Sequence, residues 1–243
     1  MAKSLCLVFV LITAWPASVG ARVCCEGPVA CAVDYAQDNT LTAEEAQAGW
    51  RLLFDGSTFQ GWGCTAADFG GWSVNDGAIA GTGTGGYIYT AERFGDFELK
   101  VDFMVDDGSN SGIFFRWDEL DDPVQTGIEM QILDSAGKKT PGKHDCGALY
   151  DILSPSENAM KPAHEWNSVI IKCRGPFVSI DMNGKSIIRA DLSKYTVPHK
   201  NIDGSSNKFS RALKDFARSG HIGFQAHGRP VWFKNVKVRA IDK

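Results

Sequence analysis

A cation, a carboxylate and an amide recur at alternate positions of two segments that lie close together in the sequence. Arg116 belongs to the run Gly112–Asp118, whereas Glu129 and Gln131 belong to the run Gly127–Asp134. Both runs are typical of strands, in which alternate side chains share one face. If the strands are neighbours in register, the three polar groups converge on one sheet surface. A core face does not need such groups, so the pattern indicates a ligand-binding face.

Glu129 is the first candidate in this group for a general base or a metal ligand. The plainer alternative is a solvent-facing strand carboxylate that forms an ion pair with Arg116. The same alternation predicts that Ile113, Phe115 and Trp117 share the opposite face of their strand.

Other candidate groups lie in loops and at strand ends. His144 lies in a Gly/Lys-rich loop beside Asp145, and such a pair could act as an acid and base, although many exposed loop histidines have no such role. Asp134 at its strand end could ligate a metal, but it is equally suited to a turn. A divalent ion could be held by Glu129, Asp134 and His144. The five histidines show no spacing such as HExxH, so the sequence establishes no metal site.

The segments that must position these groups are predicted to be short strands joined by close turns. Phe97–Phe103 alternates strictly between apolar and polar residues. Asn183-Gly184 predicts a tight hairpin, and Gly228–Pro230 predicts the turn between a final strand pair, His221–His227 and Val231–Val238. There is no internal repeat and no alternation of strands with long helices. The predicted fold class is therefore all-β, an antiparallel β-sandwich with few short helices.

Two short helices are expected. In Leu41–Gly49, Thr42 can cap the first turn with Glu45 as its capping-box partner, and Gly49 can end the helix. Asn207–Phe216 is predicted to form a second short helix beside a loop.

Composition bounds the class of protein. The chain has 243 residues, 44% of them hydrophobic and 22% charged, which is ordinary for a globular protein. Its 26 glycines suit a fold with many turns. The net charge is −4 and there is no basic cluster, so nucleic acid is not an expected partner.

The first 21 residues are predicted to be a signal peptide. Lys3 precedes the apolar run Leu5–Ala14, which is too short to span a bilayer, and a cleavage point follows near Ala21. A lipid anchor at Cys24 is a weaker alternative, because Ala21–Val23 is a poor approach to a lipidated cysteine. We therefore expect export to the periplasm or the extracellular space, with no membrane insertion once the leader is cleaved. Residues 22–49 would form a cysteine-containing extension with the short helix, and residues 50–243 the β-sandwich domain.

Six cysteines remain after the leader is removed. They are Cys24, Cys25, Cys31, Cys64, Cys146 and Cys173. An even number of cysteines in an exported chain indicates disulfides, with fifteen possible pairings. A zinc site is the alternative, but the first three lack the usual paired two-residue spacing.

Several motifs occur in a fixed order along most of the chain. They are LLFDG from Leu52, NSGIFFR from Asn110, GIEMQILD from Gly127, CGALYDI from Cys146, KPAHEWN from Lys161, the Asn183-Gly184 hairpin, and GHIGFQAHG from Gly220 followed by VWFKNVKV. In this order the sequence resembles the DUF1080 family, also called the 3-keto-disaccharide hydrolase domain, from about Leu52 to Ile241. It departs from that family in the Cys24–Cys31 segment and in a longer insert around Pro198–Arg218. Both departures could alter one rim of the groove.

The resemblance implies a concanavalin-like jelly roll of two curved sheets. It also implies export and action on a carbohydrate partner, a glycoside already oxidised at carbon 3. The ketone acidifies the proton on carbon 2, a base removes it, and the group on carbon 1 leaves from the enolate. Water then adds to the enone. Such a site needs a base, an electrophile for the enolate oxygen and an acid for the leaving group.

The resemblance gives the candidate residues roles in this reaction. Glu129 would be the base, Arg116 would hold a sugar oxygen or the enolate, and Lys161 could stabilise the enolate oxygen, although by itself Lys161 is typical of a surface lysine. Gln131 would hydrogen-bond sugar hydroxyls. The roles of the remaining substrate-binding candidates stay open: Tyr150 could stack on a sugar, donate its hydroxyl or pack in the core, and Gln225 and His227 share a face on which His227 could be a ligand, a base or a strand-end histidine.

Two other functions remain open at this point. Lectin-like modules share the fold, so the domain could bind carbohydrate without catalysis. An ordinary glycosidase would need two carboxylates that flank a glycosidic bond, and Glu129 lacks an obvious partner on a facing strand. The sequence specifies neither the linkage, nor the metal, nor the oligomeric state.

Overall fold

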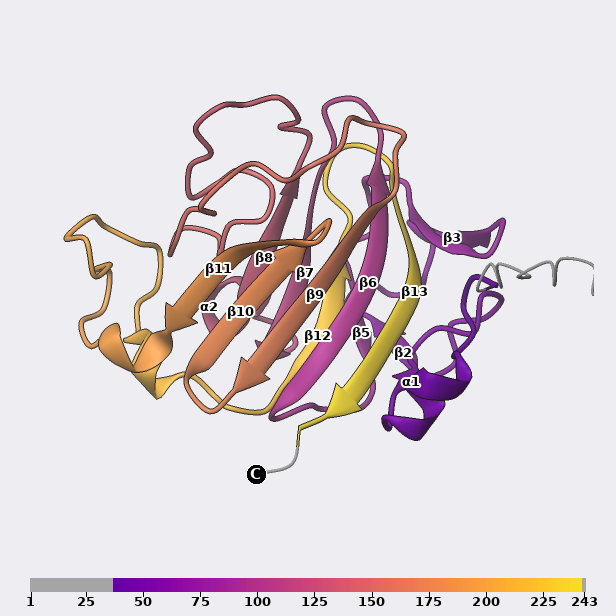
Figure 1. Ribbon diagram of the computed structural model, residues 1–243, viewed down its shortest axis with the longest axis horizontal. Coiled ribbons are helices and arrows are strands. Elements are labelled where there is room, and N and C mark those ends of the chain that lie inside the picture. Colours follow the sequence, from indigo (N-terminus) through magenta and orange to yellow (C-terminus); the bar gives the residue numbers. More distant parts are fainter. Residues whose placement is uncertain (1–36, 242–243) are drawn as a thin grey trace, which may run out of the picture. The chain divides into compact units, whose positions relative to one another are not determined.

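Two antiparallel β-sheets pack face to face and form the body of the protein (Figure 1). The computed structural model describes residues 37–241. The predicted leader, residues 1–21, and the cysteines Cys24, Cys25 and Cys31 lie outside the described residues.

The larger sheet has eight strands. They are β1 (Arg51–Leu52), β3 (Trp72–Asn75), β4 (Ala78–Gly81), β6 (Phe97–Val105), β9 (Asn167–Arg174), β10 (Phe177–Met182), β11 (Lys185–Asp191) and β13 (Val231–Ala240). Their order is β11-β10-β9-β6-β13-β4-β3, and β1 also pairs with β13.

The smaller sheet has five strands. They are β2 (Trp62–Cys64), β5 (Tyr87–Thr90), β7 (Asn110–Trp117), β8 (Ile128–Leu133) and β12 (His221–Gln225). Their order is β2-β5-β12-β7-β8. The helices are α1 (Ala43–Gln47), α2 (Pro123–Thr126) and the 3₁₀ turns η1 (Leu192–Lys194) and η2 (Leu213–Asp215). Among the described residues no helix has both the length and the apolar character that a membrane span requires.

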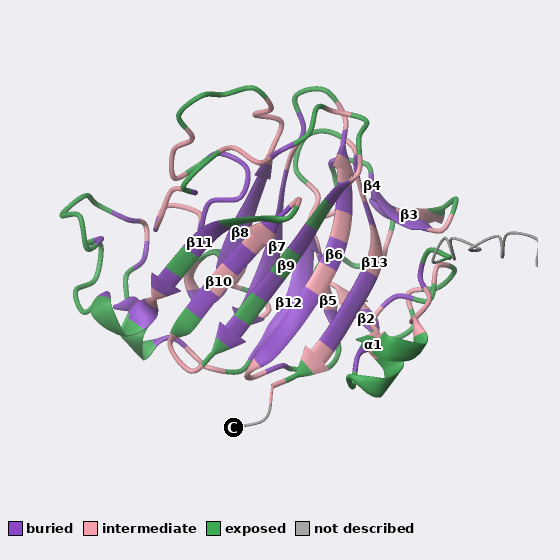
Figure 2. Ribbon diagram, viewed as in Figure 1, coloured by how far each residue is buried: buried purple, intermediate pink, exposed green. Residues whose placement is uncertain are grey.

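Buried residues alternate with more exposed ones along β9 and β10 (Figure 2), and the buried side chains of the strands form the core between the sheets. On β6 the inward positions predicted from the alternation are all buried, namely Phe97, Leu99, Val101 and Phe103. Phe224 of β12 stacks on Phe233 of β13 with ring centroids 4.0 Å apart, which joins the two sheets. The jelly-roll β-sandwich predicted from the sequence is confirmed.

The sequence predicted that the final two strands pair with each other, and this prediction is wrong. β12 lies in the five-stranded sheet between β5 and β7, whereas β13 lies in the other sheet between β6 and β4. The turn Gly228–Pro230 therefore carries the chain across the sandwich. A turn signal cannot distinguish a hairpin from such a crossing, because both need the same backbone reversal.

The expected convergence of Arg116 with Glu129 is wrong, and a β-bulge is the reason. Phe114 pairs with Gly223 and Trp117 with His221, so β7 has one residue more than β12 over this stretch. Arg116 takes a φ of +50°. The extra residue reverses the alternation. Trp117 therefore lies on the face of Phe114, and Arg116 turns in between the sheets.

Arg116 ties the two sheets together at the bulge. Its guanidinium donates to the Gly175 carbonyl at 2.7 Å and to Asp96 Oδ1 at 3.0 Å. The side chain is 1% exposed. A Cβ at Gly220 would collide with the bulged backbone, so this neighbour must be a glycine. The position of Arg116 is that of a structural residue, distant from the outer surface of the sheet.

Two local predictions are confirmed and one is wrong. Thr42 and Glu45 form the expected capping box of α1, and Asn183 and Gly184 both have positive φ in the β10–β11 hairpin. The helix predicted over Asn207–Phe216 is reduced to η2. The amide N–H groups of Phe209 and Ser210 bond to the side chains of Asn207 and Gln125 instead. Such side-chain bonds compete with helix formation.

No disulfide joins the three cysteines that the structure describes, and pairings with Cys24, Cys25 and Cys31 stay a prediction. Cys64, Cys146 and Cys173 are free. Burial raises the pKa of the Cys146 and Cys173 thiols to about 12, so both are unreactive at neutral pH.

Replacement of Arg116 by methionine should destabilise the fold strongly. The change keeps an unbranched side chain but removes the buried guanidinium that donates to Asp96 and to the Gly175 carbonyl. Both acceptors therefore lose this partner. We expect a loss of about 3 kcal/mol in the free energy of unfolding, measured by urea denaturation. The control is Arg189→Met, because the Arg189–Asp181 pair is exposed and should contribute about 0–1 kcal/mol. Equal losses in the two variants would contradict the structural role of Arg116.

Candidate active site

Glu129 and Gln131 lie on the outer face of the five-stranded sheet. Their neighbours Ile128, Met130 and Ile132 point into the core, so the alternation places the two polar side chains opposite. Phe114 pairs with Glu129 across the strands. The prediction that Glu129 and Gln131 share one face of their strand is confirmed, although Arg116 does not lie on that face.

Glycines make the floor of this face flat. Gly63, Gly112 and Gly223 lie on strands β2, β7 and β12. A Cβ there would collide with the Tyr89 ring, the Glu129 carboxylate and the Trp117 ring, respectively. The large side chains therefore lie across the backbone of neighbouring strands. The result is a shallow surface bordered by rings and by one carboxylate.

Lys208 and Tyr150 surround the carboxylate of Glu129. Lys208 Nζ lies 3.7 Å from Glu129 Oε2 and 4.4 Å from the centroid of the Tyr150 ring. The Tyr150 amide donates to the Glu129 carbonyl at 2.9 Å, which fixes the tyrosine beside the strand edge. A carboxylate, an ammonium group and a phenol thus meet at one place.

Burial gives Glu129 an unusual proton affinity. The residue is 6% exposed, and loss of solvent raises its pKa from 4.5 to about 7 despite the opposing effect of Lys208. The 3.7 Å separation exceeds a hydrogen bond, so the ion pair offsets the burial only in part. Burial likewise lowers the pKa of Lys208, against the fields of Glu129 and Asp151. A carboxylate that titrates near neutrality is suited to general-base catalysis.

Two loops hold these groups in place. The Lys208 amide donates to Asp151 Oδ2 at 2.6 Å, and Gln125 donates to the Lys208 carbonyl at 3.0 Å. His144 Nε2 lies 3.0 Å from Asp151 Oδ1, and its ring lies 4.7 Å from that of Tyr150. The predicted partner of His144 was Asp145, but Asp145 instead accepts from Lys138 at 2.7 Å. Asp151 therefore orients both His144 and the loop that carries Lys208.

Further along the sheet, amides and rings continue the polar face. Gln131 Nε2 lies 3.0 Å from Asn110 Oδ1, and Asn110 Nδ2 lies 2.9 Å from His227 Nδ1. In the flipped orientation of the Gln131 amide, its nitrogen lies 3.2 Å from Glu129 Oε1 and donates to the carboxylate in place of Asn110. These contacts place Gln131 and His227 on one network with Glu129.

Gln225 belongs to the same face. It donates to the Tyr87 hydroxyl at 2.9 Å. Burial raises the pKa of the Tyr87 phenol, the bond from Gln225 lowers it, and the charge of Glu129 raises it by a smaller amount.

Two predicted site residues lie elsewhere. Lys161 donates to the Trp166 carbonyl at 2.9 Å, in the loop that leads into β9 of the other sheet. Asp134 accepts from the Gly108 amide at 2.9 Å, and it follows Glu129 by five residues, roughly 16 Å along the strand. Within residues 37–241, Lys161 forms neither a hydrogen bond nor an ion pair with Glu129.

The trio proposed as metal ligands is consequently not assembled. Glu129, Asp134 and His144 are too widely spaced, since ligand oxygens and nitrogens lie within about 2.6 Å of a bound ion. Across the described residues, three ligand atoms come close enough to share an ion where Asp106 and Asp107 of the β6–β7 turn meet His164 of the loop before β9. This cluster has no contact with the Glu129 surface that would make it part of the site.

Sequence reasoning missed Lys208 and the tyrosines of β5. Lys208 lies in the Pro198–Arg218 insert, where no strand period indicates a direction for its side chain. Tyr87 and Tyr89 flank the buried Ile88, so the alternation that identified Glu129 could also have placed both tyrosines on the outer face.

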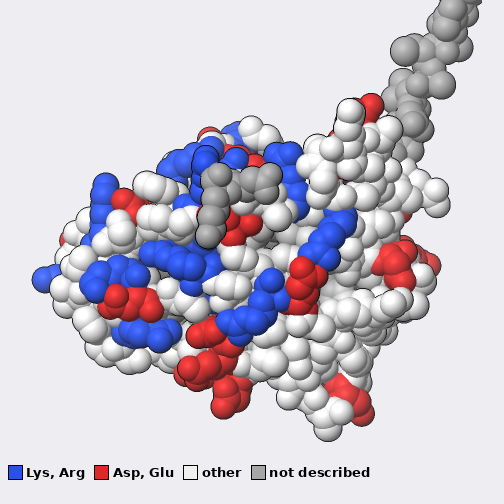
Figure 3. Space-filling model, turned by 90° about the horizontal axis from the view of Figure 1, so that it is seen from below, with Lys and Arg blue, Asp and Glu red and all other residues white. Residues whose placement is uncertain are grey.

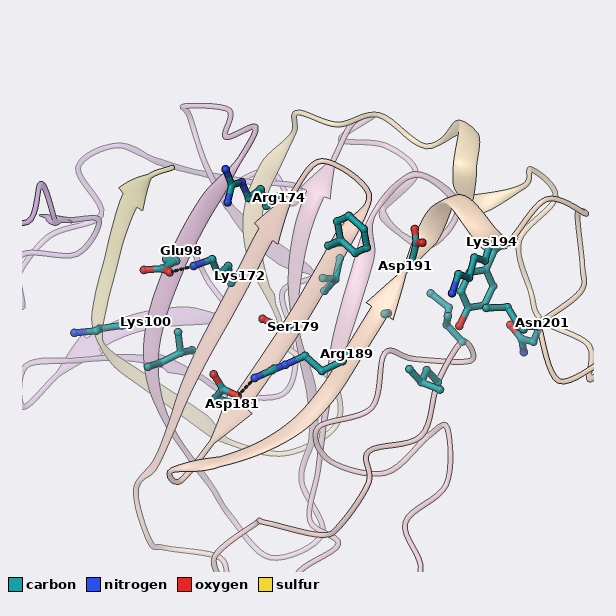
Figure 4. Close-up of a pocket in the computed structure, with 18 of the residues that line it drawn as sticks. Glu98, Lys100, Lys172, Arg174, Ser179, Asp181, Arg189, Asp191, Lys194 and Asn201 are labelled. Atoms are coloured by element: carbon teal, nitrogen blue, oxygen red, sulfur yellow. Dashed lines mark hydrogen bonds and ion pairs between the residues drawn. The ribbon is translucent and has the colours of Figure 1, made fainter. Parts of the chain in front are cut away.

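A hollow of about 1200 Å³ lies on the outer face of the eight-stranded sheet (Figure 4). Its charges are largely paired: Lys172 bonds to Glu98 at 2.6 Å and Arg189 to Asp181 at 3.0 Å. Burial alone would raise the pKa of Glu98, but the bonds from Lys172 and Arg239 lower it. Figure 3 likewise shows acidic and basic side chains interspersed on the face in view. Glu98 in this hollow is therefore a paired carboxylate with a lowered pKa, in contrast to Glu129.

The comparisons with known proteins agree with a carbohydrate-related site. The family model described as the 3-keto-alpha-glucoside-1,2-lyase-like domain matches residues 49–239, so the chain belongs to that family, one of glycoside-acting hydrolases and lyases. The chain is 28% identical over 229 residues to a 3-keto-disaccharide hydrolase of Bacteroides thetaiotaomicron, a match that covers 80% of this chain and 79% of that protein.

Two crystal structures from Parabacteroides distasonis, both of provisionally assigned glycosyl hydrolases, are also similar. One has a TM-score of 0.71 at 31% identity and covers 79% of this chain and 99% of its own. The other has a TM-score of 0.71 at 28% identity, with coverages of 85% and 100%.

The raised pKa of Glu129 should make stability depend on pH. Between pH 4.5 and about pH 7 the folded state retains a proton that the unfolded state releases. The free energy of unfolding therefore falls as the pH rises through this window, by about 3 kcal/mol. Glu129→Gln cannot titrate, so its stability relative to the wild type should increase by that amount over the window. Urea denaturation at several pH values measures this difference.

The control for this experiment is Glu98→Gln, because the pKa of Glu98 is lowered in the folded state. There the sign reverses: the wild type gains stability relative to the variant as the pH rises through the titration range of the carboxyl group. A difference between Glu129→Gln and the wild type that stays constant from pH 4 to pH 8 would contradict the raised pKa.

Proposed function

We propose that the protein is an exported enzyme that cleaves glycosides carrying a ketone at carbon 3. The reaction is removal of the carbon-2 proton, expulsion of the group on carbon 1 and addition of water. The observation that carries the proposal is Glu129, a buried carboxylate with a pKa of about 7 that faces an ammonium group and a phenol on the outer side of the five-stranded sheet. The family membership and the name of the Bacteroides relative support the substrate class.

Glu129 acts as the base. Near neutral pH about half of its population is ionised, while its proton affinity is high enough to accept a proton from a carbon made acidic by the adjacent ketone. The electron pair left on carbon 2 moves to form the enolate, with its negative charge on the former carbonyl oxygen.

Lys208 and Tyr150 stabilise that oxygen. The ammonium group lies on the same side of Glu129 as the tyrosine ring, and a fixed cation in a partly buried site favours developing negative charge. Lys208 thus takes the role that the sequence had assigned to Arg116 or Lys161.

His144 completes the proton transfers. Held by Asp151, it donates a proton to the leaving oxygen as the bond from carbon 1 breaks. Water then attacks carbon 1 and gives its proton to His144, while Glu129, whose carboxyl proton exchanges with solvent during the lifetime of the enone, protonates carbon 2. Both groups return to their initial state, and the net reaction is hydrolysis.

The two alternatives fit this site less well. A carbohydrate-binding module has no need of a carboxylate that titrates near pH 7. A two-carboxylate glycosidase needs a second free carboxylate near Glu129. Asp151 is the acid closest to this role, but its oxygens already accept from the Lys208 amide and contact His144.

The carbon-3 ketone should be essential for cleavage. The protein is expected to cleave 3-keto-glucosides and to leave the parent glucosides intact, because only the ketone makes the carbon-2 proton acidic. In heavy water, proton NMR should show deuterium at carbon 2 of the product. Equal cleavage of both substrates, or full retention of the carbon-2 proton, would rule out elimination and support the two-carboxylate alternative.

Two substitutions should remove turnover by different routes. Glu129→Gln removes the base, and Gly112→Ala places a methyl group where the Glu129 carboxylate lies. Each should lower kcat by about a hundredfold or more on a 3-keto-glucoside while the far-UV circular dichroism stays native. Gly95→Ala is the matched control, since its Cβ would meet its nearest neighbour at an ordinary 3.8 Å. Wild-type turnover in Glu129→Gln would remove this residue from the mechanism.

A further inference from the structure

A chain of polar side chains runs along the outer face of the five-stranded sheet from Glu129 to the exposed ring of His227. The terminal atoms of the Gln131 amide lie 3.2 Å from Glu129 Oε1 on one side and 3.0 Å from the Asn110 amide on the other. The Asn110 amide in turn lies 2.9 Å from His227 Nδ1. Each amide has a donor end and an acceptor end, so the direction of every hydrogen bond follows once one amide is oriented.

The Ser111 carbonyl orients the Gln131 amide. The terminal atom of Gln131 that is closest to Glu129 Oε1 also lies 3.2 Å from the Ser111 carbonyl oxygen. A carbonyl oxygen and an ionised carboxylate can only accept. This atom is therefore the amide nitrogen, and its two hydrogens match the two acceptors. The oxygen of Gln131 consequently faces Asn110.

The same reasoning fixes the hydrogen on His227. Because Asn110 meets an oxygen of Gln131 at 3.0 Å, it donates there through its nitrogen, and its own oxygen then faces the imidazole at 2.9 Å. An amide oxygen cannot donate to the ring, so His227 Nδ1 carries a hydrogen and donates to Asn110. When the ring is neutral, its second nitrogen, Nε2, is left with a lone pair. This ring is exposed, so the lone pair is available to a ligand.

The two oxygens of Glu129 face opposite ends of the site. Oε2 lies 3.7 Å from Lys208 Nζ, whereas Oε1 lies over Gly112 and points toward the amide chain. Asn110 precedes Gly112 by two residues along β7, roughly 7 Å. A single sugar ring with its hydroxyl groups can span such a distance. A ring bound over Glu129 therefore has an ammonium group toward one edge and the lone pair of His227 toward the other.

We infer that His227 is a substrate-orienting residue of fixed polarity, which accepts a hydrogen bond from a sugar hydroxyl through Nε2 and so directs the ketone toward Lys208. The inference rests on the proposed function. A ketone oxygen at His227 would face a lone pair, whereas a hydroxyl group there can donate. At Lys208 the preference is the opposite, because an ammonium group only donates. The two ends of the site thus distinguish the ketone from the hydroxyl groups by the direction of the hydrogen bond.

The first test locates the hydrogen on His227 and needs no substrate. Long-range proton–nitrogen NMR spectra of protein labelled with ¹⁵N-histidine are recorded at about pH 9, where histidine side chains are neutral. The hydrogen of His227 should be on Nδ1. His164 is the internal control, because its Nε2 lies 3.5 Å from Asp107 Oδ2 and should carry the hydrogen. A hydrogen on Nε2 of His227 in the wild type would overturn the inference.

Two matched substitutions test whether the amide chain sets this state. Gln131→Met should move the hydrogen to Nε2, although two hydrogen bonds separate Gln131 from the ring. Asn110 is then free to donate to Nδ1, the arrangement that an unconstrained imidazole favours. Gln225→Met is the control, since Gln225 lies on the same face but bonds to the Tyr87 hydroxyl, and it should leave the hydrogen on Nδ1. An unchanged ring in Gln131→Met contradicts the chain.

The second test measures the contact with substrate. It uses 3-keto-glucosides that lack one hydroxyl group, at carbon 4 or at carbon 6. Loss of the hydroxyl that meets His227 should lower kcat/KM about tenfold in the wild type. His227→Leu should cause a similar loss on the complete substrate and no further loss on that analogue. His164→Leu, which removes an exposed histidine near the β6–β7 turn, is the control and should change neither.

The outcomes separate the inference from the proposed function. If the losses from His227→Leu and from each missing hydroxyl multiply, the contact is overturned while the proposed function stands. Absence of wild-type turnover on every keto-substrate overturns the proposed function and the contact together, and the NMR result on the amide chain is independent of it. A hydrogen on Nδ1 together with a non-additive loss at one carbon supports the inference.

Discussion

The contact of Arg116 with Asp96 and the Gly175 carbonyl is the constraint on which the outer face depends. It holds one extra residue of β7 in a bulge and turns a cation into the space between the sheets. Because the bulge reverses the alternation, Trp117 moves to the outside, where it packs over Gly223 beside the tyrosines of β5. A regular β7 would instead point Arg116 at Glu129 and neutralise the carboxylate by a close ion pair.

The absence of that close partner explains the chemistry of Glu129. Its carboxylate is buried over Gly112, and the nearest cation, Lys208, comes from a loop and stands 3.7 Å away. Burial raises the pKa more than the cation lowers it. The contrast with Glu98 is instructive, because two basic side chains bond directly to that carboxyl and lower its pKa. Thus the same sandwich carries a paired, structural carboxylate on one outer face and an available one on the other.

The two sides of the site come from different kinds of structure. Strands β7, β8, β12 and β5 supply a floor whose spacing is set by backbone hydrogen bonds. Loops supply Lys208, Tyr150 and His144, and Asp151 connects these loops through its two oxygens. Because the floor is set by strands and the polar groups are carried by loops, the insert around Pro198–Arg218 can change the rim of the site while the strand floor stays fixed.

The sequence by itself determined the alternation of the strands, and hence the all-β sandwich, the buried face of β6 and the outward direction of Glu129 and Gln131, because a period of two is a local property. It also determined the α1 capping box and the Asn183-Gly184 turn. Only the tertiary structure decided that Arg116 faces inward, that β12 and β13 lie in different sheets, and that Lys208 faces Glu129. Each of these depends on a partner distant in the chain: Asp96 and Gly175 for the bulge, β5 and β6 for the last strands, and Asp151 for the loop.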